Sequence, residues 1–388
     1  MKIPIYLDYA STTPVDPKVS QKMIKYLTIN GIFGNPNSRS HSYGWEAENA
    51  IIKARKQIAS LIGADSEEII FTSGATESNN IAIKNTSYLL KKRYKHIITS
   101  LTEHKSVLNI CAKLEKKGFK ITRIIPDINN GLINLKKILE SIRSDTFLIS
   151  LMHANNEIGT INDIKNIGKL CKNNNIIFHV DASQSVGKIP INLKKMNIDL
   201  MSFSSHKLYG PKGIGGLFIK KKSKIFLKKN IYQKNNNNNV QFGTLPVHQI
   251  VGMGEAYKIA KKEMFYEIPK LYYFKKKLWK GLKKISGIKI NGDFKKSIPN
   301  ILNISFNYID NISLIMILKN LAISTGSACS SGNKESSYVL KSIGINDNLA
   351  KNTLRLSIGR FTTKKEINYS IKYIKDSIKK YNFFFKTL

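Results

Sequence analysis

Lys207 stands in a stretch that could make its amine reactive. The stretch, SFSSHKLYGPKGIGG, runs from Ser202 to Gly216 and passes from an apolar run into hydroxyl groups, a histidine and a turn rich in glycine. A lysine at the end of a buried strand can lose its proton through desolvation, and an uncharged amine attacks aldehydes. Lys207 is therefore a candidate Schiff-base residue, although an ordinary surface lysine fits the same letters. The glycines do not form a Walker loop, which ends in Gly-Lys-Ser/Thr.

Asp181 follows the apolar run IIFHV and is expected at the buried end of a strand. A buried carboxylate needs a cationic partner. The protonated pyridine nitrogen of pyridoxal phosphate (PLP) is such a partner, and an aspartate paired with it keeps the ring an electron sink. A capping aspartate is the alternative interpretation.

The stretch TSGATESNN, from Thr72 to Asn80, predicts a strand, a turn of small residues and the start of a helix. Free backbone N–H groups at that start, together with the Thr76 hydroxyl, could hold a phosphate. Taken alone the signal is weak, because any strand-to-helix turn looks similar. In combination with Lys207 and Asp181, in this order along the chain, it indicates a PLP site.

The chain has three cysteines, too few and too scattered for a disulfide framework or a zinc site, which favours a reducing compartment. Cys111 and Cys171 lie in segments with helical apolar spacing, and we expect both to be buried. Cys329 lies in STGSACSSGNKESS, which has no apolar periodicity and predicts an exposed, flexible loop. A thiolate on such a loop could reach a cofactor as a nucleophile and leave again. An incidental surface cysteine is the alternative.

Short β-rich runs alternate with amphipathic helical stretches from about residue 50 to 220, which is typical of an α/β fold. Several runs are apolar throughout, as strands covered on both faces are, so we expect a mostly parallel central sheet. Polar residues crowd at the carboxyl ends of the runs, where open α/β sheets bind ligands. The predicted strands are 68–73, 95–100, 146–153, 176–183, 199–205 and 215–220.

A second domain is expected because 388 residues exceed the size at which single cores usually divide. A lysine-rich helix, predicted from Glu255 to Ile285, leads into a segment that ends in helical repeats. We predict a large PLP-binding domain over 16–261. Residues 1–15 and 262–388 would form a smaller α+β domain that carries the Cys329 loop and Arg355. The run Asn235 to Asn239 is expected to be a mobile loop.

The net charge of +37 raises the question of nucleic-acid binding. The lysines are spread along the whole chain with Ile and Asn, without a clustered basic tail, so we expect no direct nucleic-acid partner. No stretch approaches the ~20 apolar residues of a membrane span, and the start has no secretion-signal pattern. These features predict a soluble, cytoplasmic protein.

The chain resembles the cysteine desulfurases of the IscS/NifS type, in class V of the fold-type I PLP-dependent family. The resemblance covers nearly the whole length, and the motifs that carry it occur in the family's order. These motifs are LDYASTTPVDP, GNPNSRSH, FTSGATESNN, TEHKSV, MHANNEIG, HVDASQSVGK, MSFSSHKLYGPKG, GTLPVHQIVGMGEAY, STGSACSSG and LRLSIGRFTT. The resemblance implies a fold-type I transferase that takes sulfur from L-cysteine, leaves L-alanine and holds the sulfur as a persulfide on Cys329.

The resemblance also implies a role for each matching residue. Lys207 would hold the cofactor and move the α-proton, His104 would stack on the ring and transfer protons, and the Cys329 thiolate would attack the substrate sulfur. Arg355 would bind the substrate carboxylate, a task suited to a bidentate guanidinium. The other cofactor contacts would be Asp181 to the ring nitrogen, Gln184 to the ring oxygen, Asn156 facing cofactor and substrate, and Ala75, Thr76, Ser204 and His206 to the phosphate.

Partners follow from the same resemblance. Thr244 matches a threonine that completes the phosphate site of the other subunit, so a homodimer is implied. The persulfide would supply an iron–sulfur scaffold protein and other sulfur acceptors, including those of tRNA thiolation. Cys329 is, through that persulfide, also a candidate transient ligand of an iron–sulfur centre.

The chain departs from the family pattern at three places. Gln241 and Phe242, after the asparagine run, stand where arginine and serine are usual. Ser205 replaces a glycine, which would crowd the phosphate if that backbone needs a positive φ. The end, KYNFFFKTL, stops short of the tail by which relatives dock the scaffold.

Three other functions remain possible from the sequence. Another PLP reaction, such as an aminotransferase or a selenocysteine lyase, would share Lys207 and Asp181 but would not need Cys329. A basic binding protein would leave the ordered motifs unexplained. An inactive relative would fit the altered loop before Thr244.

Overall fold

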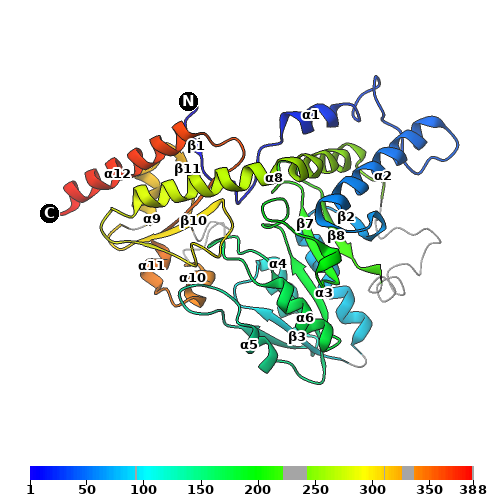
Figure 1. Ribbon diagram of the computed structural model, residues 1–388, viewed down its shortest axis with the longest axis horizontal. Coiled ribbons are helices and arrows are strands. Elements are labelled where there is room, and N and C mark those ends of the chain that lie inside the picture. The colour runs from blue at the N-terminus through cyan, green and yellow to red at the C-terminus, as the bar shows by residue number, and fades with distance from the viewer. Residues whose placement is uncertain (92–93, 222–242, 310, 326–335, 387–388) are drawn as a thin grey trace.

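The computed structural model describes residues 1–91, 94–221, 243–309, 311–325 and 336–386 (Figure 1). Within them, a seven-stranded sheet has the order β2-β8-β7-β6-β5-β3-β4. Its strands are β2 Ile69–Thr72, β3 His96–Ser100, β4 Lys120–Ile124, β5 Thr146–Met152, β6 Ile177–Asp181, β7 Leu200–Ser204 and β8 Gly215–Ile219. Among these strands β8 alone runs in the opposite direction to the others, so the predicted mostly parallel sheet is confirmed.

Helices cover both faces of this sheet. On one face, α2 (Ser42–Ile62), α6 (Ile164–Asn173) and α8 (Val247–Leu282) pack in one apolar core. On the other, α3 (Ala75–Leu90) and α4 (Lys105–Glu115) pack against the strands. Successive side chains of a strand point to opposite faces, which is why Met201 and Phe203 join the first core and Leu200 joins the second layer. The remaining elements here are α1 Pro17–Ile24, α5 Leu135–Glu140, and the 3₁₀ turns η1 Ser66–Glu68 and η2 Leu193–Lys195.

The reversed strand β8 sits between β2 and β7 and is antiparallel to both. Strand β2 therefore runs in the same direction as β7, β6 and β5. As a result, the start of α3 after β2, Asp181 at the end of β6 and Ser204 at the end of β7 reach the same edge of the sheet. This edge is where the sequence predicted ligand binding.

A second, antiparallel sheet has the order β12-β13-β10-β9 and its own apolar core. Strand β1 near the start of the chain pairs with β11, so both chain ends join this part of the molecule. The predicted domain boundaries, 16–261 against 1–15 with 262–388, stay a prediction. The elements are β1 Ile5–Tyr6, β9 Ile288–Ile290, β10 Ile301–Phe306, α9 Asn311–Ile317, β11 Leu321–Ala322, β12 Ser324–Thr325, α10 Tyr338–Ser342, α11 Asp347–Lys351, β13 Thr353–Ser357 and α12 Lys364–Lys386.

Helix α8 spans both parts of the molecule (Figure 1). Its first half places Ile250 and Tyr257 in the core of the large sheet, and its second half places Leu271 and Leu278 in the core of the small one. It begins earlier than the predicted start at Glu255. A single rigid element thus links the two sheets that face the cavity described below.

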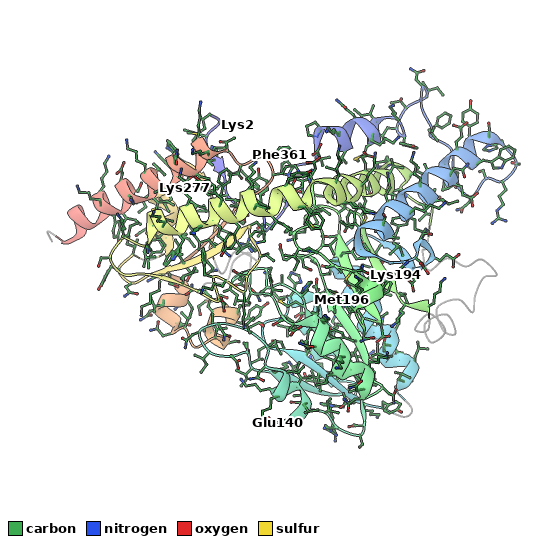
Figure 2. The ribbon with its side chains drawn as sticks, in the orientation of Figure 1. Lys2, Glu140, Lys194, Met196, Lys277 and Phe361 are labelled. Atoms are coloured by element: carbon green, nitrogen blue, oxygen red, sulfur yellow. The ribbon has the colours of Figure 1, made fainter. Side chains whose placement is uncertain are left out.

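Basic side chains occur in widely separated parts of the structure. The labelled lysines Lys2, Lys194 and Lys277 lie on three separate segments of the molecule (Figure 2). Among the residues that the structure describes, no helix is both long and apolar enough to cross a bilayer.

Candidate active site

A cavity of about 570 Å³ opens at the carboxyl edge of the large sheet. Segments from the start of the chain, from both sheets and from α3 and α4 line it. The structure brings most of the predicted site residues together there: Ala75, Thr76, His104, Asn156, Asp181, Gln184, Ser204, His206, Lys207 and Arg355.

One end of the cavity has donors suited to an anion. Helix α3 begins after Gly74 without a side-chain cap, and a β-carbon added to Gly74 would meet nothing within 4 Å. Gly74, Ala75 and Thr76 all line the cavity, so the uncapped start of the helix is open to a ligand. The buried hydroxyl of Ser204, which also lines the cavity, has no hydrogen-bond partner within the described residues. An uncapped helix start beside an unpartnered buried hydroxyl fits the phosphate of PLP.

His206 lines the same end of the cavity and is neutral at physiological pH. Its Nδ1 lies 3.1 Å from the hydroxyl oxygen of Thr12. Burial, reinforced by nearby lysines, lowers the pKa of His206 to about 4. The imidazole can therefore contribute one N–H donor, but no full charge, to a bound anion.

Asp181 is held in place by protein donors. Its Oδ1 accepts from the backbone N–H of Ser183 at 3.0 Å and from the Ser183 hydroxyl at 2.5 Å. Its Oδ2 accepts from Nδ2 of Asn79 at 2.8 Å. The side chain lines the cavity and is 6% exposed. These contacts orient a carboxylate as a partner for a cationic ring nitrogen.

The carbonyl oxygen of Ala10 accepts hydrogen bonds from two predicted site residues. Nζ of Lys207 donates to it at 2.6 Å, and Nε2 of Gln184 donates at 2.8 Å. Oε1 of Gln184 accepts from Nζ of Lys188 at 2.8 Å. Lys188 is buried, and burial, followed by the charges of Lys207 and Arg355, lowers its pKa to about 7. The segment at the start of the chain therefore positions the amine of Lys207.

His104 is the N-cap of α4. Its Nδ1 accepts from the backbone N–H of Ser106 at 3.1 Å and lies 2.8 Å from the Ser106 hydroxyl oxygen. Burial lowers the pKa of His104, while the charge of Asp181 opposes that shift. The ring is therefore fixed on one nitrogen and lines the cavity with its remaining surface.

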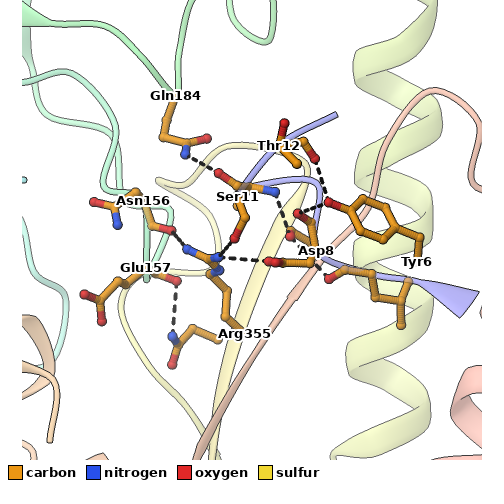
Figure 3. Close-up of polar contacts among 12 residues, drawn as sticks. Tyr6, Asp8, Ser11, Thr12, Asn156, Glu157, Gln184 and Arg355 are labelled. Carbon is orange, nitrogen blue, oxygen red and sulfur yellow. Dashed lines mark hydrogen bonds and ion pairs between the residues drawn. The ribbon is translucent and has the colours of Figure 1, made fainter. Parts of the chain in front are cut away.

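Arg355, on β13, reaches the cavity from the small sheet (Figure 3). Its Nη1 donates to the carbonyl oxygen of Asn156 at 2.7 Å. Its Nη2 donates to Oδ1 of Asp8 at 2.9 Å and to the Ser11 hydroxyl at 2.7 Å, which uses both Nη2 hydrogens. A bidentate grip on a carboxylate needs two adjacent N–H groups. A substrate carboxylate must therefore displace Asp8 or Ser11.

Two buried glutamates lie just behind the site. Oε2 of Glu157 accepts from the Ser337 hydroxyl at 2.5 Å, and burial raises the pKa of Glu157 to about 7. Oε1 of Glu103 accepts from the backbone N–H of Met152 at 2.9 Å, and burial raises the pKa of Glu103 well above its usual range. Glu103 directly precedes His104 and Glu157 directly follows Asn156, so both side-chain hydrogen bonds anchor the chain next to a predicted site residue.

Several predictions have other outcomes. Thr244 is exposed and is not among the residues that line the cavity of its own chain. Cys329, the run Asn235 to Asn239, Gln241 and Phe242 lie outside the described residues. The described residues form no cluster of His, Cys, Asp and Glu that could hold a metal ion.

Two predictions about single residues can be compared with the structure directly. Ser205 does not adopt a positive φ, so the condition under which it would crowd the phosphate is not met. Its buried hydroxyl has no hydrogen-bond partner within the described residues. Cys111 and Cys171 are both buried, as predicted, and burial raises the pKa of each thiol.

The sequence analysis gave no role to several residues that the structure places in or beside the site. Asp8, Ala10, Ser11 and Thr12 come from the motif LDYASTTP. The polar side chains of Asp8, Ser11 and Thr12 were an available signal, whereas Ala10 acts through its backbone carbonyl. Asn79 lies one helical turn after Ala75, a spacing that places both on one side of α3.

Comparisons with known proteins agree with this geometry. The aminotransferase class-V family matches residues 5–369. A relative from Salmonella arizonae, "Cysteine desulfurase IscS", is 54% identical over 378 residues, covering 97% of this chain and 93% of the relative. A solved "NIFS-LIKE PROTEIN" superposes with a TM-score of 0.88 at 34% identity, covering 97% of this chain and 99% of the other. The structure "SspA in complex with cysteine" has a TM-score of 0.81 at 35% identity, covering 92% and 100%.

The chain belongs to the aminotransferase class-V family, a fold-type I family of PLP-dependent enzymes. Within that family it groups with the cysteine desulfurases, which confirms the resemblance recognised in the sequence.

Proposed function

We propose that this chain removes sulfur from free L-cysteine, releases L-alanine and keeps the sulfur as a persulfide on Cys329. The observation that carries the proposal is the cavity itself. It places the amine of Lys207, the carboxylate of Asp181 and the guanidinium of Arg355 at one edge of the sheet. An amine for an aldehyde, an anion for a cationic ring and a cation for a carboxylate are the groups this reaction needs.

PLP would be held by Lys207 through its amine, by Asp181 at the ring nitrogen and by Gln184 at the ring oxygen, with His104 against the ring. The start of α3 at Ala75 and Thr76, with Ser204 and His206, would hold the phosphate, and Thr244 would complete that site in the partner subunit of a homodimer. When bound, PLP supplies an electron sink for the negative charge that develops at the substrate α-carbon.

The protein's own groups would then divide the work. Arg355 would orient the substrate by its carboxylate after Asp8 or Ser11 yields, with Asn156 beside it. The amine of Lys207 would take the α-proton and return a proton to carbon. The Cys329 thiolate would attack the substrate sulfur, so that a sulfur–sulfur bond forms as the carbon–sulfur bond breaks. One L-cysteine and one thiol thus become one L-alanine and one persulfide.

The family resemblance also supports a proposal about the acceptors of the sulfur and the cellular location of the protein. The persulfide would supply an iron–sulfur scaffold protein and other acceptors, including those of tRNA thiolation, with Cys329 as a candidate transient ligand of the nascent cluster. The cysteine usage favours the cytoplasm. Neither nucleic acid nor membrane is proposed as a direct partner.

The test is production of alanine and sulfide from L-cysteine by PLP-loaded protein with a reductant present. Equal amounts of both products, abolished by Lys207→Ala and by Cys329→Ala, are expected. The matched controls are Lys194→Ala, on the surface, and Cys111→Ala, in the core of α4. Turnover that is indifferent to Cys329, or that yields a keto acid, would instead mean a different PLP reaction.

A further inference from the structure

We propose that Asn79 is a positioning residue of the active site. Its side-chain amide links the carboxylate of Asp181 to the Ser106 hydroxyl and, through Ser106, holds His104 as the tautomer that carries its proton on Nε2. The inference rests on the roles proposed above for Asp181 and His104 and adds a residue that controls both.

The orientation of the Asn79 amide follows from its neighbours. An ionised carboxylate only accepts hydrogen bonds, so the atom of Asn79 that lies 2.8 Å from Oδ2 of Asp181 must be the nitrogen. The same nitrogen lies 2.9 Å from the Ser106 hydroxyl oxygen. Both amide hydrogens are therefore used, and the Ser106 oxygen accepts one of them.

The state of His104 follows in turn. Since the Ser106 oxygen accepts from Asn79, its own hydrogen is available for Nδ1 of His104 at 2.8 Å. The backbone N–H of Ser106 donates to the same Nδ1 at 3.1 Å. Two donors converge on one ring nitrogen, which must present a lone pair, so the neutral ring carries its proton on Nε2.

The charged groups around His104 support a neutral ring. Burial lowers the pKa of His104, and the charges of Lys207 and Lys105 lower it further, against the opposing charge of Asp181. A protonated ring would also lose both hydrogen bonds at Nδ1 and with them the cap of α4. His104 thus presents an N–H hydrogen-bond donor at Nε2 to the cavity, while its Nδ1 lone pair is held by Ser106.

The arrangement carries a cost that packing alone does not explain. Asn79 is 1% exposed, and its Oδ1 is buried without a hydrogen-bond partner within the described residues. A buried acceptor without a hydrogen bond destabilises the folded protein. A leucine of similar size would avoid that cost but would donate nothing to Asp181 or Ser106.

The experiment follows His104 by nuclear magnetic resonance in the PLP-loaded protein labelled with ¹⁵N at histidine, with His104→Gln used to assign the signal. In the natural protein we expect the Nε2–H tautomer and a pKa below the usual histidine value. In Asn79→Leu, the Ser106 hydroxyl loses the donor that orients it and can turn its oxygen toward Nδ1, so the pKa of His104 should rise by about one unit. The rate of alanine formation should fall about tenfold.

Asn80→Leu is the matched control, because within the described residues its amide donates to the backbone carbonyl of Thr76 and to neither Asp181 nor Ser106. It should leave the His104 titration unchanged. Ser106→Ala, which removes only the hydroxyl, gives a second reading if Asn79→Leu fails to fold, and should raise the pKa of His104 in the same direction. A lowered melting temperature with an unchanged His104 titration in both variants would overturn the inference. The titration needs no turnover, so a protein that makes no alanine would refute the proposed function separately.

Discussion

The two sheets present their groups to the cavity in different ways. From the parallel sheet, Asp181 is bound by Asn79 and Ser183, and no step of the proposed reaction displaces these donors. From the antiparallel sheet, Arg355 is bound by Asp8 and Ser11, one of which a substrate carboxylate must displace. The cofactor side is thus preorganised, as electrostatic stabilisation requires, while the substrate side is kept in place by exchangeable partners.

The largest expected effect comes from breaking the preorganised side. Asp181→Asn keeps the size but removes the charge, and it sets an amide against the donors of Asn79 and Ser183. We expect the rate of alanine formation to fall about 10³-fold, the scale of losing a preorganised charge interaction. Asp127→Asn, at a half-buried ion pair with Lys137 away from the cavity, is the control. A loss of less than tenfold, with PLP still bound by its absorbance, would contradict the comparison.

The next effect concerns Glu157, which lies where the two sheets meet. Its backbone carbonyl accepts from Asn303 of the small sheet, and its side chain accepts from Ser337. The folded-state pKa is about 7, above the ordinary 4.5, so the folded protein binds the extra proton and loses stability as the pH rises between these values. Over this pH range the unfolding free energy of the natural protein should fall by about 3 kcal/mol more than that of Glu157→Gln.

Unfolding free energies of both proteins at pH 5 and pH 8 measure this effect. Glu140→Gln, on the exposed surface of α5, should follow the natural protein at both pH values. Parallel pH profiles for the natural protein and Glu157→Gln would show that Glu157 is ionised in the fold.

Arg355→Lys tests the substrate side. A lysine cannot make the bidentate contact, so KM for L-cysteine should rise about 10²-fold, with a smaller change in kcat. Arg123→Lys, at a surface pair with Glu115, should change neither constant. A fall in kcat at constant KM would place Arg355 on the preorganised side instead.

The smallest expected effect tests whether the substrate carboxylate takes the place of Asp8 on Arg355. Asp8→Asn weakens the interaction with Arg355 that the substrate displaces. It also removes a negative charge beside the bound substrate carboxylate. KM should fall, by about fivefold, as expected for the loss of a pair worth about 1 kcal/mol. Asp65→Asn, at an exposed pair with Lys221, serves as the control. A raised KM would mean that Asp8 orients Arg355 rather than competing for it.

Much of the fold could be predicted because strands buried on both faces are continuous apolar runs, as in LMSFS of β7. Strand β4, with the mixed sequence KITRI, lies at the edge of the sheet and is half-exposed, so it lacked that signal. The early start of α8 was missed for a different reason. Gly252 and Gly254 lie there against Met23 and Ala54, and such close approach between helices is decided by tertiary packing.

Some site residues could likewise be predicted from local sequence, and others could not. Lys207 and Asp181 could be predicted because each follows a buried strand, and that local pattern implies desolvation. The hydrogen bonds of Ala10 and Asn79 could not, because they join segments far apart in the chain: 197 positions separate Lys207 from Ala10, and 102 separate Asn79 from Asp181.

The bond between Asp8 and Arg355 spans 347 positions, nearly the whole chain. On the ribosome, the first residues must wait for β13 to emerge before they find this partner, and contacts across such separations form slowly because of the entropy of closing the loop. A nascent chain therefore carries the amine of Lys207 well before it has the group for a substrate carboxylate. The enzyme becomes able to select its substrate only after β13 has been synthesised.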